Sequence, residues 1–264
     1  AIGTTTADGT TGAYTIAPTV ALGDGDYALT VTATDAAGNI SDASSALSIT
    51  IDTTAPAAPT FTTTDTTTND TTPIIIGTAE AGSTVELFNG RVSLGTTTAD
   101  VTTGIFSITP SSELSEGVNS LTVTATDAIN NVSTASSVLS ITVDTTAPAQ
   151  PSITTTTSLT NDSTPAIEGV ADSGSIINLF IDGNNSGIST RADVNGYFSI
   201  NAPLQLDGNY VFAVSSSDPL GNSSELSNSV SITIDATAPG KPSIITTTTL
   251  TKDSTPTIEG IAEA

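Results

Sequence analysis

Apolar and small polar residues alternate along much of this chain. The alternation has a period of two in residues 12–16, 27–35 and 46–51. Successive side chains of a strand point to opposite faces of a sheet, so this period is the mark of a strand with one buried and one exposed face. The pattern therefore predicts short, half-buried antiparallel strands.

The strand pattern repeats along the chain. Asp52-Thr-Thr-Ala-Pro56 recurs as Asp144-Thr-Thr-Ala-Pro148 and, with one change, as Asp235-Ala-Thr-Ala-Pro239. The three aspartates are 92 and 91 residues apart, and a fixed period of this length indicates tandem structural units. We therefore expect a partial domain with C-terminal strands, two complete domains and a partial domain with N-terminal strands: 1–52, 53–144, 145–235 and 236–264.

The first complete repeat holds seven candidate strands, at 59–63, 73–79, 83–89, 91–98, 104–109, 118–127 and 137–144. Asn89-Gly90 between the third and fourth is a strong hairpin signal, and Asp182-Gly183 suggests a slightly longer turn in the next repeat. Seven short strands with regular turns predict an all-β fold: tandem immunoglobulin-like Greek-key β-sandwich domains in an end-to-end array.

Threonine-rich stretches stand near the start of each repeat. They are residues 62–64, 66–68, 154–157 and 246–249. Threonine favours strands, so we expect edge strands at most of these stretches rather than low-complexity linkers.

Composition limits the partners of the chain. Apolar residues make up 36% and aromatic residues only 4%, so the cores must consist mainly of Val, Ile, Leu and Ala. The net charge of −23 argues against a nucleic-acid partner and against docking on an anionic membrane. No apolar run approaches membrane-spanning length, so we expect no membrane insertion. The chain lacks an initial Met and a signal-peptide pattern, and we expect it to be part of a longer polypeptide.

The chain contains neither Cys nor His. Disulfides, thiolate or imidazole metal sites and Ser-His-Asp or Cys-His catalytic sets are therefore excluded. Glycosidase-like carboxylate pairs are conceivable, but the same pairs recur in every repeat, and a catalytic site copied in this way is improbable. We expect that the chain is not an enzyme.

Carboxylates also recur at fixed positions. If each strand reverses the direction of the one before, the turns fall alternately at the two ends of a domain, and carboxylates of adjacent repeats meet at each junction. Between the complete repeats we expect six: Asp70, Glu116, Asp144, Asp172, Asp193 and Asp218. The first and third junctions hold Asp24, Asp52, Glu80, Asp100 and Asp127, and then Asp162, Asp207, Asp235 and Glu263.

Carboxylates gathered in this way repel one another unless a cation neutralises them. Ca²⁺ takes about six to eight oxygen ligands and tolerates irregular geometry, so it fits an all-oxygen site better than Zn²⁺, Cu²⁺ or Mg²⁺. The best candidate ligands are the residue at the end of the seventh strand and the carboxylates in two turns. One turn joins the second and third strands, and the other joins the sixth and seventh. Asp70 and Glu116 would hold a second ion or support the first. The alternative is that each aspartate only forms a turn.

Three sequence stretches together resemble a known family. They are Gly77-Thr-Ala-Glu-Ala-Gly-Ser-Thr-Val85, Val123-Thr-Ala-Thr-Asp127 and the Asp-Thr-Thr-Ala-Pro repeats. They are similar to the bacterial immunoglobulin-like tandem repeats of giant secreted surface adhesins, namely biofilm-associated, type I-secreted and RTX-type proteins. The resemblance covers the whole chain.

The resemblance implies sandwich domains whose junctions Ca²⁺ makes rigid, in an extender at the bacterial cell surface that supports adhesion or biofilm formation. By that resemblance Asp52, Asp144 and Asp235 match the linker ligands of the family. Its turn ligands correspond to Glu80, Asp127, Asp172, Asp218 and Glu263. Asp172 departs from the pattern because it is one methylene shorter than Glu, and the turns of Asp100 and Asp193 differ in length.

Two further hypotheses remain open. The chain could be a self-assembling extracellular filament or surface-layer subunit, in which the terminal strands of one chain complete the first domain of the next. Its partners would then be further copies of itself as well as the neighbouring repeats of the same chain. Regular threonine arrays could instead form a flat carbohydrate- or ice-binding face.

Overall fold

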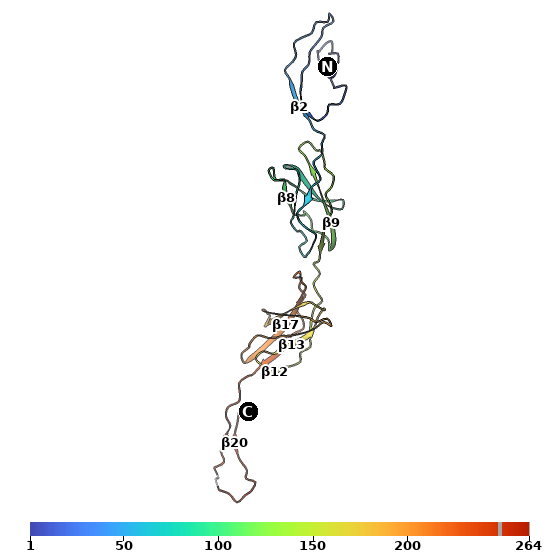
Figure 1. The fold of residues 1–264 in the computed structure, drawn as a ribbon. Coiled ribbons are helices and arrows are strands. Elements are labelled where there is room, and N and C mark those ends of the chain that lie inside the picture. Colours follow the sequence, from blue (N-terminus) through green and yellow to red (C-terminus); the bar gives the residue numbers. More distant parts are fainter. Residues whose placement is uncertain (248–249, 264) are drawn as a thin grey trace. The chain divides into compact units, whose positions relative to one another are not determined.

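The computed structural model describes residues 1–247 and 250–263. It contains only strands and turns in these residues, with no helix and therefore none that could cross a membrane. The chain divides into two compact units, Ala1–Val143 and Asp144–Ala264, each of which holds one complete β-sandwich (Figure 1). The predicted all-β fold is confirmed.

The first sandwich packs a three-stranded sheet against a five-stranded sheet. Their strand orders are β3-β5-β8 and β4-β10-β9-β6-β7, and all pairs are antiparallel except β4 with β10. The chain passes between the sheets after β3, β4, β5, β7 and β8, which is Greek-key connectivity. The strands are β3 (Thr60–Phe61), β4 (Thr66–Thr68), β5 (Ile75–Thr78), β6 (Thr84–Asn89), β7 (Val92–Thr98), β8 (Ile105–Ile108), β9 (Gly117–Thr126) and β10 (Leu139–Val143).

The second sandwich repeats this arrangement, with sheets β11-β13-β16 and β12-β18-β17-β14-β15 and a parallel pair β12–β18. Its strands are β11 (Ser152–Ile153), β12 (Leu159–Thr160), β13 (Ala166–Val170), β14 (Ile176–Ile181), β15 (Asn184–Arg191), β16 (Tyr197–Asn201), β17 (Gly208–Ser217) and β18 (Val230–Ile234). The strand predicted at 59–63 is observed as β3 alone, and the next short strand, β4, pairs with the other sheet. β11 and β12 are divided between the two sheets of the second sandwich in the same way.

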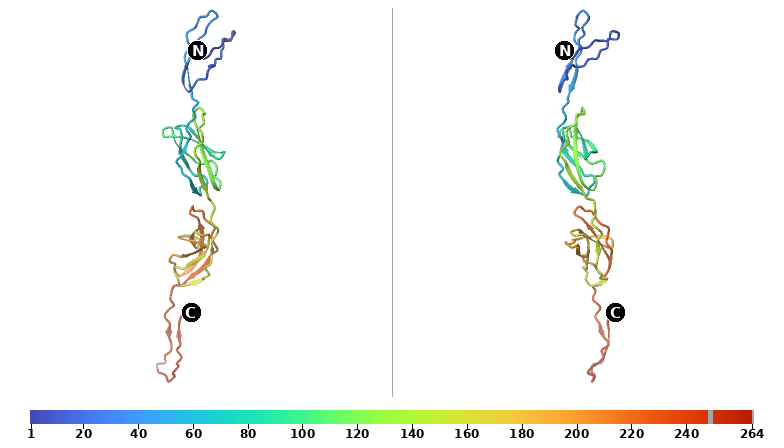
Figure 2. Two further views of the ribbon diagram at one scale, coloured as in Figure 1. Left: turned by 45° about the vertical axis from the view of Figure 1, so that its right-hand side comes forward. Right: turned by 90° about the vertical axis from the view of Figure 1, so that its right-hand side faces the viewer.

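The terminal segments form hairpins without a facing sheet (Figure 2). β1 (Gly25–Leu29) pairs with β2 (Leu47–Ile51), and β19 (Ser243–Ile244) pairs with β20 (Gly260–Ile261). Residues 12–16, predicted as a strand, do not form one. They correspond to β8, whose partner is β5, and residues 1–52 contain no counterpart of β5.

The threonine tracts have different structures. Thr66–Thr68 is the edge strand β4, as predicted. Residues 62–64 and 154–157 are not strands, because they lie where the chain crosses from the first sheet to the second. Residues 248–249 of the fourth tract lie outside the described residues.

Both predicted hairpins form, but each turn differs from the prediction, the first in its residues and the second in its length. Asn89 ends β6 and pairs with Val92, so the two-residue loop is Gly90-Arg91, with Gly90 at φ 62°. Asp182-Gly183 is also a two-residue loop, not the longer turn expected from the sequence, and its φ angles are 49° and 79°. Positive φ at both positions matches the twist of the flanking strands.

Serine hydroxyls complete the pairing of the long strands β9 and β17. β10 covers only the first half of β9, and the Ala125 and Val123 amides donate instead to the hydroxyls of Ser133 (2.9 Å) and Ser136 (3.1 Å). Ser224 and Ser227 accept in the same way from β17. These side chains satisfy backbone groups that would otherwise lose their partners inside the domain.

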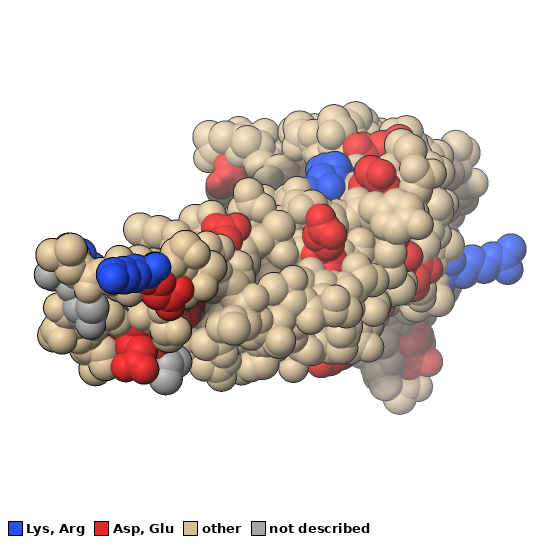
Figure 3. All heavy atoms as spheres, turned by 90° about the horizontal axis from the view of Figure 1, so that it is seen from below, with Lys and Arg blue, Asp and Glu red and all other residues tan. Residues whose placement is uncertain are grey.

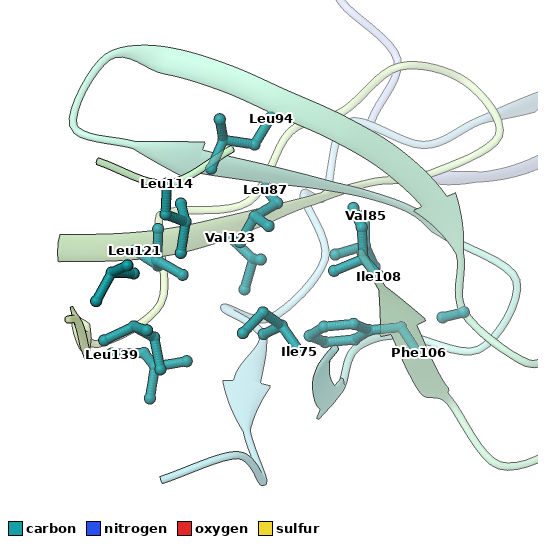
Figure 4. Close-up of a cluster of buried hydrophobic side chains, with 13 residues drawn as sticks. Ile75, Val85, Leu87, Leu94, Phe106, Ile108, Leu114, Leu121, Val123 and Leu139 are labelled. Carbon is teal, nitrogen blue, oxygen red and sulfur yellow. The ribbon is translucent and has the colours of Figure 1, made fainter. Parts of the chain in front are cut away.

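Each sandwich has its own aliphatic core. In the first, Ile75, Leu87 and Leu121 are fully buried, and the Phe106 ring lies beside Ile75 (Figure 4). Gly77 of β5 faces this ring: a Cβ there would lie 2.2 Å from the Thr60 carbonyl oxygen and 2.4 Å from Phe106 Cζ. Gly169 stands in the same relation to Ser152 and Phe198 of the second sandwich. A residue without a side chain is therefore required opposite this ring in each sandwich.

We predict that Gly169→Ala destabilises the second sandwich by about 1–3 kcal/mol, the usual cost of inserting a methyl group into a packed core. The transition of the second sandwich in a calorimetric melt should move to lower temperature while that of the first stays in place. Gly208→Ala is the matched control, since its Cβ would meet Tyr210 at an ordinary 3.6 Å. Equal effects of the two substitutions would contradict the packing argument.

Candidate metal-binding turns and linkers

The predicted ligands lie at opposite ends of each sandwich. In the first, Glu80, Asp100 and Asp127 follow β5, β7 and β9, and we name this the N-terminal end. Its turns are bonded to each other, since the Gly82 amide donates to the Ala99 carbonyl (3.2 Å). Asp172, Asp193 and Asp218 form the N-terminal end of the second sandwich. Asp70, Glu116, Asp162 and Asp207 precede β5, β9, β13 and β17 at the other, C-terminal ends.

Asp127 is the centre of the turn after β9. Its Oδ1 accepts from the backbone amides of Ile129 (2.9 Å) and Asn131 (2.8 Å), and its Oδ2 accepts from Asn131 Nδ2 (2.8 Å). Desolvation raises the pKa of Asp127, but the hydrogen bonds from Asn131 and Ile129 outweigh it and leave the pKa below its ordinary value. The carboxylate is therefore held in its charged form.

The same turn occurs in the other repeats. Asp218 Oδ1 accepts from the amides of Leu220 and Asn222 (both 2.9 Å), and Asp218 Oδ2 accepts from Asn222 Nδ2 (2.8 Å). Asp35 and Asn39 form an equivalent set. As at Asp127, desolvation raises the pKa of Asp218 and the bonds from Asn222 more than offset it.

The asparagine of this turn also holds the linker. Asn222 Nδ2 donates to the backbone carbonyl of Asp144 (2.8 Å), and Asn131 Nδ2 donates to that of Asp52 (3.1 Å). Sequence reasoning did not assign this role to the asparagines, although the Asp-x-x-x-Asn spacing was visible. The two linker aspartates are thus joined to the turns of Asp218 and Asp127 through one amide each.

A second contact holds the linker from the turn before the third strand. Asp172 Oδ2 accepts from the Ala149 amide (2.7 Å), and Glu263 Oε2 accepts from the Gly240 amide (2.5 Å). Among the described residues, the Glu80 carboxylate accepts no such bond. Asp144, Asp172 and Asp218 therefore all lie along the linker of residues 144–149.

The C-terminal ends hold the linker as it leaves the last strand. Asp24 accepts from the amide (2.9 Å) and hydroxyl (2.8 Å) of Thr53 and from the Thr54 hydroxyl (2.6 Å). Asp207 accepts from the Ala236 amide and the Thr237 hydroxyl. These hydrogen bonds lower the pKa of Asp24 and of Asp207. The largest effect comes from the Thr54 hydroxyl at Asp24 and from the Thr237 hydroxyl at Asp207. Glu116 occupies this position in the first sandwich.

The remaining predicted ligands accept hydrogen bonds within their own turns. The donor is a backbone amide two or three residues further on. The pairs are Asp52 with Thr54 (2.9 Å), Asp70 with Thr72 (2.8 Å), Asp100 with Thr103 (2.7 Å), Asp144 with Thr146 (3.1 Å), Asp162 with Thr164 (2.8 Å), Asp193 with Asn195 (2.8 Å) and Asp235 with Thr237 (3.3 Å).

Carboxylates are dispersed among uncharged side chains on the face drawn in Figure 3. Within the part of the chain that the structure describes, no three Asp or Glu side chains lie close enough together to hold a metal ion. All the hydrogen-bonded carboxylates above act as turn or linker acceptors, which is the alternative considered from the sequence. Their oxygens, with the linker carbonyls, are nevertheless the donor type that Ca²⁺ prefers.

We predict that Asn222→Ala destabilises the second sandwich by about 1–3 kcal/mol, because the Asp144 carbonyl and the Asp218 carboxylate both lose a donor. Amide hydrogen exchange should accelerate in residues 144–149 more than in β13 or β16. Asn228→Ala, which removes an amide bonded to Ile153 instead, is the comparison. If Asn222→Ala left the amide exchange rates of residues 144–149 unchanged, the bond from Asn222 to the Asp144 carbonyl would not be what holds the linker.

The lowered pKa of Asp100 predicts a dependence of stability on pH. The hydrogen bond from the Thr103 backbone amide has the largest effect on this pKa, and the bond from the Thr103 hydroxyl has the next largest; both lower it. The folded chain therefore binds the proton less readily than the unfolded chain. The stabilisation is complete above the ordinary aspartate pKa of about 3.9 and is lost as the pH falls through the lowered value.

Asp100→Asn should therefore reduce the melting temperature at neutral pH and converge with the original chain in acid, measured in excess chelator. The matched control is Glu168→Gln, which removes an exposed carboxylate that has no hydrogen-bond donor among the described residues. A constant difference between Asp100→Asn and the original chain at every pH would refute the assignment.

Comparisons with known structures find many similar chains, of which three are described. One is a Ca²⁺-stabilised adhesin that helps an Antarctic bacterium reach out and bind ice, with 27% identity, a TM-score of 0.44 and coverage of 83% of this chain. The chain spans only 59% of the length of that structure. Fibronectin(III)-like modules of Clostridium thermocellum CbhA have 19% identity and a TM-score of 0.39, covering 67% of this chain and 90% of theirs.

The BSP domain of a biofilm-associated protein has 24% identity and a TM-score of 0.27, covering 70% of this chain and 30% of that one. No curated protein matches the sequence. The family described as bacterial Ig-like domain matches three segments, residues 1–53, 58–145 and 149–236. The chain is therefore a tandem array of repeats that belongs to the bacterial Ig-like domain family.

Proposed function

We propose that this chain is an extender segment of a bacterial cell-surface adhesin, in which Ca²⁺ stiffens the junctions between immunoglobulin-like domains. The segment itself catalyses no reaction. Its two complete domains are residues 53–144 and 145–235, and residues 1–52 and 236–264 belong to partial domains. The extender would be secreted and would support cell adhesion or biofilm formation at the cell surface.

One observation carries this proposal. Asn131 and Asn222 join the recurring Asp-x-x-x-Asn turn to the linker carbonyls of Asp52 and Asp144, at the same register in two repeats. A linker bonded to the domain that follows it has less rotational freedom than a flexible one. This is a property that an extender needs and that a ligand-binding module does not.

Calcium is proposed from the charge and chemistry of the same ends. Asp144, Asp172 and Asp218 bring three carboxylates to one linker. Asp52 and Asp127 bring two to the preceding one, and Glu80 lies at the same end of that domain. Bound Ca²⁺ would supply the positive charge that offsets their repulsion. The chain has 27 acidic and four basic residues, so its own cations cannot supply that charge at every junction.

We predict that Ca²⁺ raises the melting temperature and gives the scattering profile of a stiffer particle, whereas excess chelator reverses both effects. A cation bound only by the folded state, at about 100 times its dissociation constant, stabilises a domain by about 2.7 kcal/mol. The double substitution of Asp144→Asn and Asp218→Asn should abolish the response in the second sandwich.

Glu168→Gln, which removes a carboxylate from an exposed sheet face, should keep the full response to Ca²⁺. A melting temperature and a scattering profile that are the same in Ca²⁺ and in chelator would contradict the proposal. The aspartates would then serve only as turn formers.

A further inference from the structure

The chain contains two Asn-Gly steps in complete domains, and the structure places them in opposite environments. Asn89-Gly90 begins the loop between β6 and β7, and Asn195-Gly196 lies in the turn between β15 and β16. Glycine has no Cβ, so the backbone nitrogen of an Asn-Gly step can approach the preceding side-chain carbonyl more closely than in other sequences. The two steps are therefore chemically equal in an unfolded chain.

Both the backbone and the side chain of Asn89 are held by neighbouring residues in the folded chain. It pairs with Val92 of β7 and Leu121 of β9, and its Nδ2 donates to Asn119 Oδ1 (2.9 Å). Asn119 is 3% exposed and is itself fixed by donating to the carbonyls of Ser115 (2.7 Å) and Gly117 (3.0 Å). Movement of the Asn89 side chain would leave a buried acceptor without its donor, which is costly.

Asn195 is held only by its backbone. Its amide donates to Asp193 Oδ1 (2.8 Å), and the Gly196 amide donates to the Asp193 carbonyl (2.9 Å). The residue is exposed, and within the described part of the chain its side-chain amide has no hydrogen-bond partner. Opening this turn breaks the hydrogen bond of the buried Gly196 nitrogen, and such local openings need little free energy compared with global unfolding.

We propose that Asn195 is a site of spontaneous deamidation and that Asn89 is protected by the fold. The Gly196 nitrogen attacks Asn195 Cγ, a C–N bond forms, the Cγ–Nδ2 bond breaks, and the proton lost by the Gly196 nitrogen leaves with Nδ2 as ammonia. The resulting five-membered imide then takes up one water at either carbonyl. Opening at one carbonyl gives aspartate at position 195, and opening at the other gives an isoaspartyl linkage.

The modification changes the N-terminal end of the second sandwich. Either product adds a carboxylate to the turn of Asp193, at the same end as Asp172 and Asp218. The isoaspartyl form also adds one atom to the backbone beside Gly196, which is buried and whose Cβ position lies 2.4 Å from the Ala171 carbonyl oxygen. This inference does not depend on calcium binding.

The test follows both peptides by mass spectrometry after incubation of the full chain in mildly alkaline buffer. In the folded protein, Asn195 should convert at least about tenfold faster than Asn89, the factor given by a difference of about 1.4 kcal/mol in opening free energy. In concentrated denaturant the two rates should be similar, because the fold no longer separates them. Released ammonia should match the converted peptide.

Two variants sharpen the result. Asn195→Gln should remove most of the ammonia released by the folded protein and leave its melting temperature unchanged, since the side chain of Asn195 has no hydrogen-bond partner among the described residues. Asn119→Ala should accelerate conversion of Asn89 by removing its acceptor. Equal rates at Asn89 and Asn195 in the folded chain, or no conversion of Asn195 when the denatured chain reacts, would overturn the proposal.

Discussion

The attachment of each linker depends on one side-chain amide. Asn222 Nδ2 bonds both to the Asp218 carboxylate and to the Asp144 carbonyl, and Asn131 does the same with Asp127 and Asp52. The charged carboxylate orients the amide, and the amide then fixes a backbone group of the linker. The charge on the aspartate therefore determines where the chain enters the domain. Turn formation and linker attachment are one interaction, which is why acidic residues recur at this register.

The low aromatic content is balanced by close backbone packing. Each sandwich has one large ring from the fifth predicted strand, Phe106 or Phe198, and a glycine of the second strand lies against it. Serine hydroxyls then replace a missing strand along β9 and β17. Small residues thus serve the fold in two ways: they leave room for the ring of the neighbouring strand, and they supply hydrogen bonds where the sheet ends.

Much of this was visible in the sequence. The period of two located the strands of the first sandwich to within about two residues, because alternation depends only on which face is buried. That β3 and β4 belong to different sheets was not visible, since it depends on which strand each of them meets. Nor was the role of Asn131 and Asn222, because a bond to a linker about 80 residues away leaves no local pattern. For the aspartates, sequence spacing placed Asp127 and Asp218 in turns, but spacing cannot tell whether a carboxylate oxygen faces an amide or a cation.

The parallel pairing of β4 with β10 and of β12 with β18 has a mechanical consequence. One strand of each pair is separated from the incoming linker only by the short strand β3 or β11, and the other precedes the outgoing linker. Tension applied through the two linkers pulls these neighbours in opposite directions along their own axes. The force then acts parallel to the strands and loads all the hydrogen bonds between them at the same time. The bonds are not opened one after another. A single bond contributes only about 0.5–1.5 kcal/mol, but bonds that must break at once resist as a group. The sandwich is therefore constructed to withstand traction along the chain.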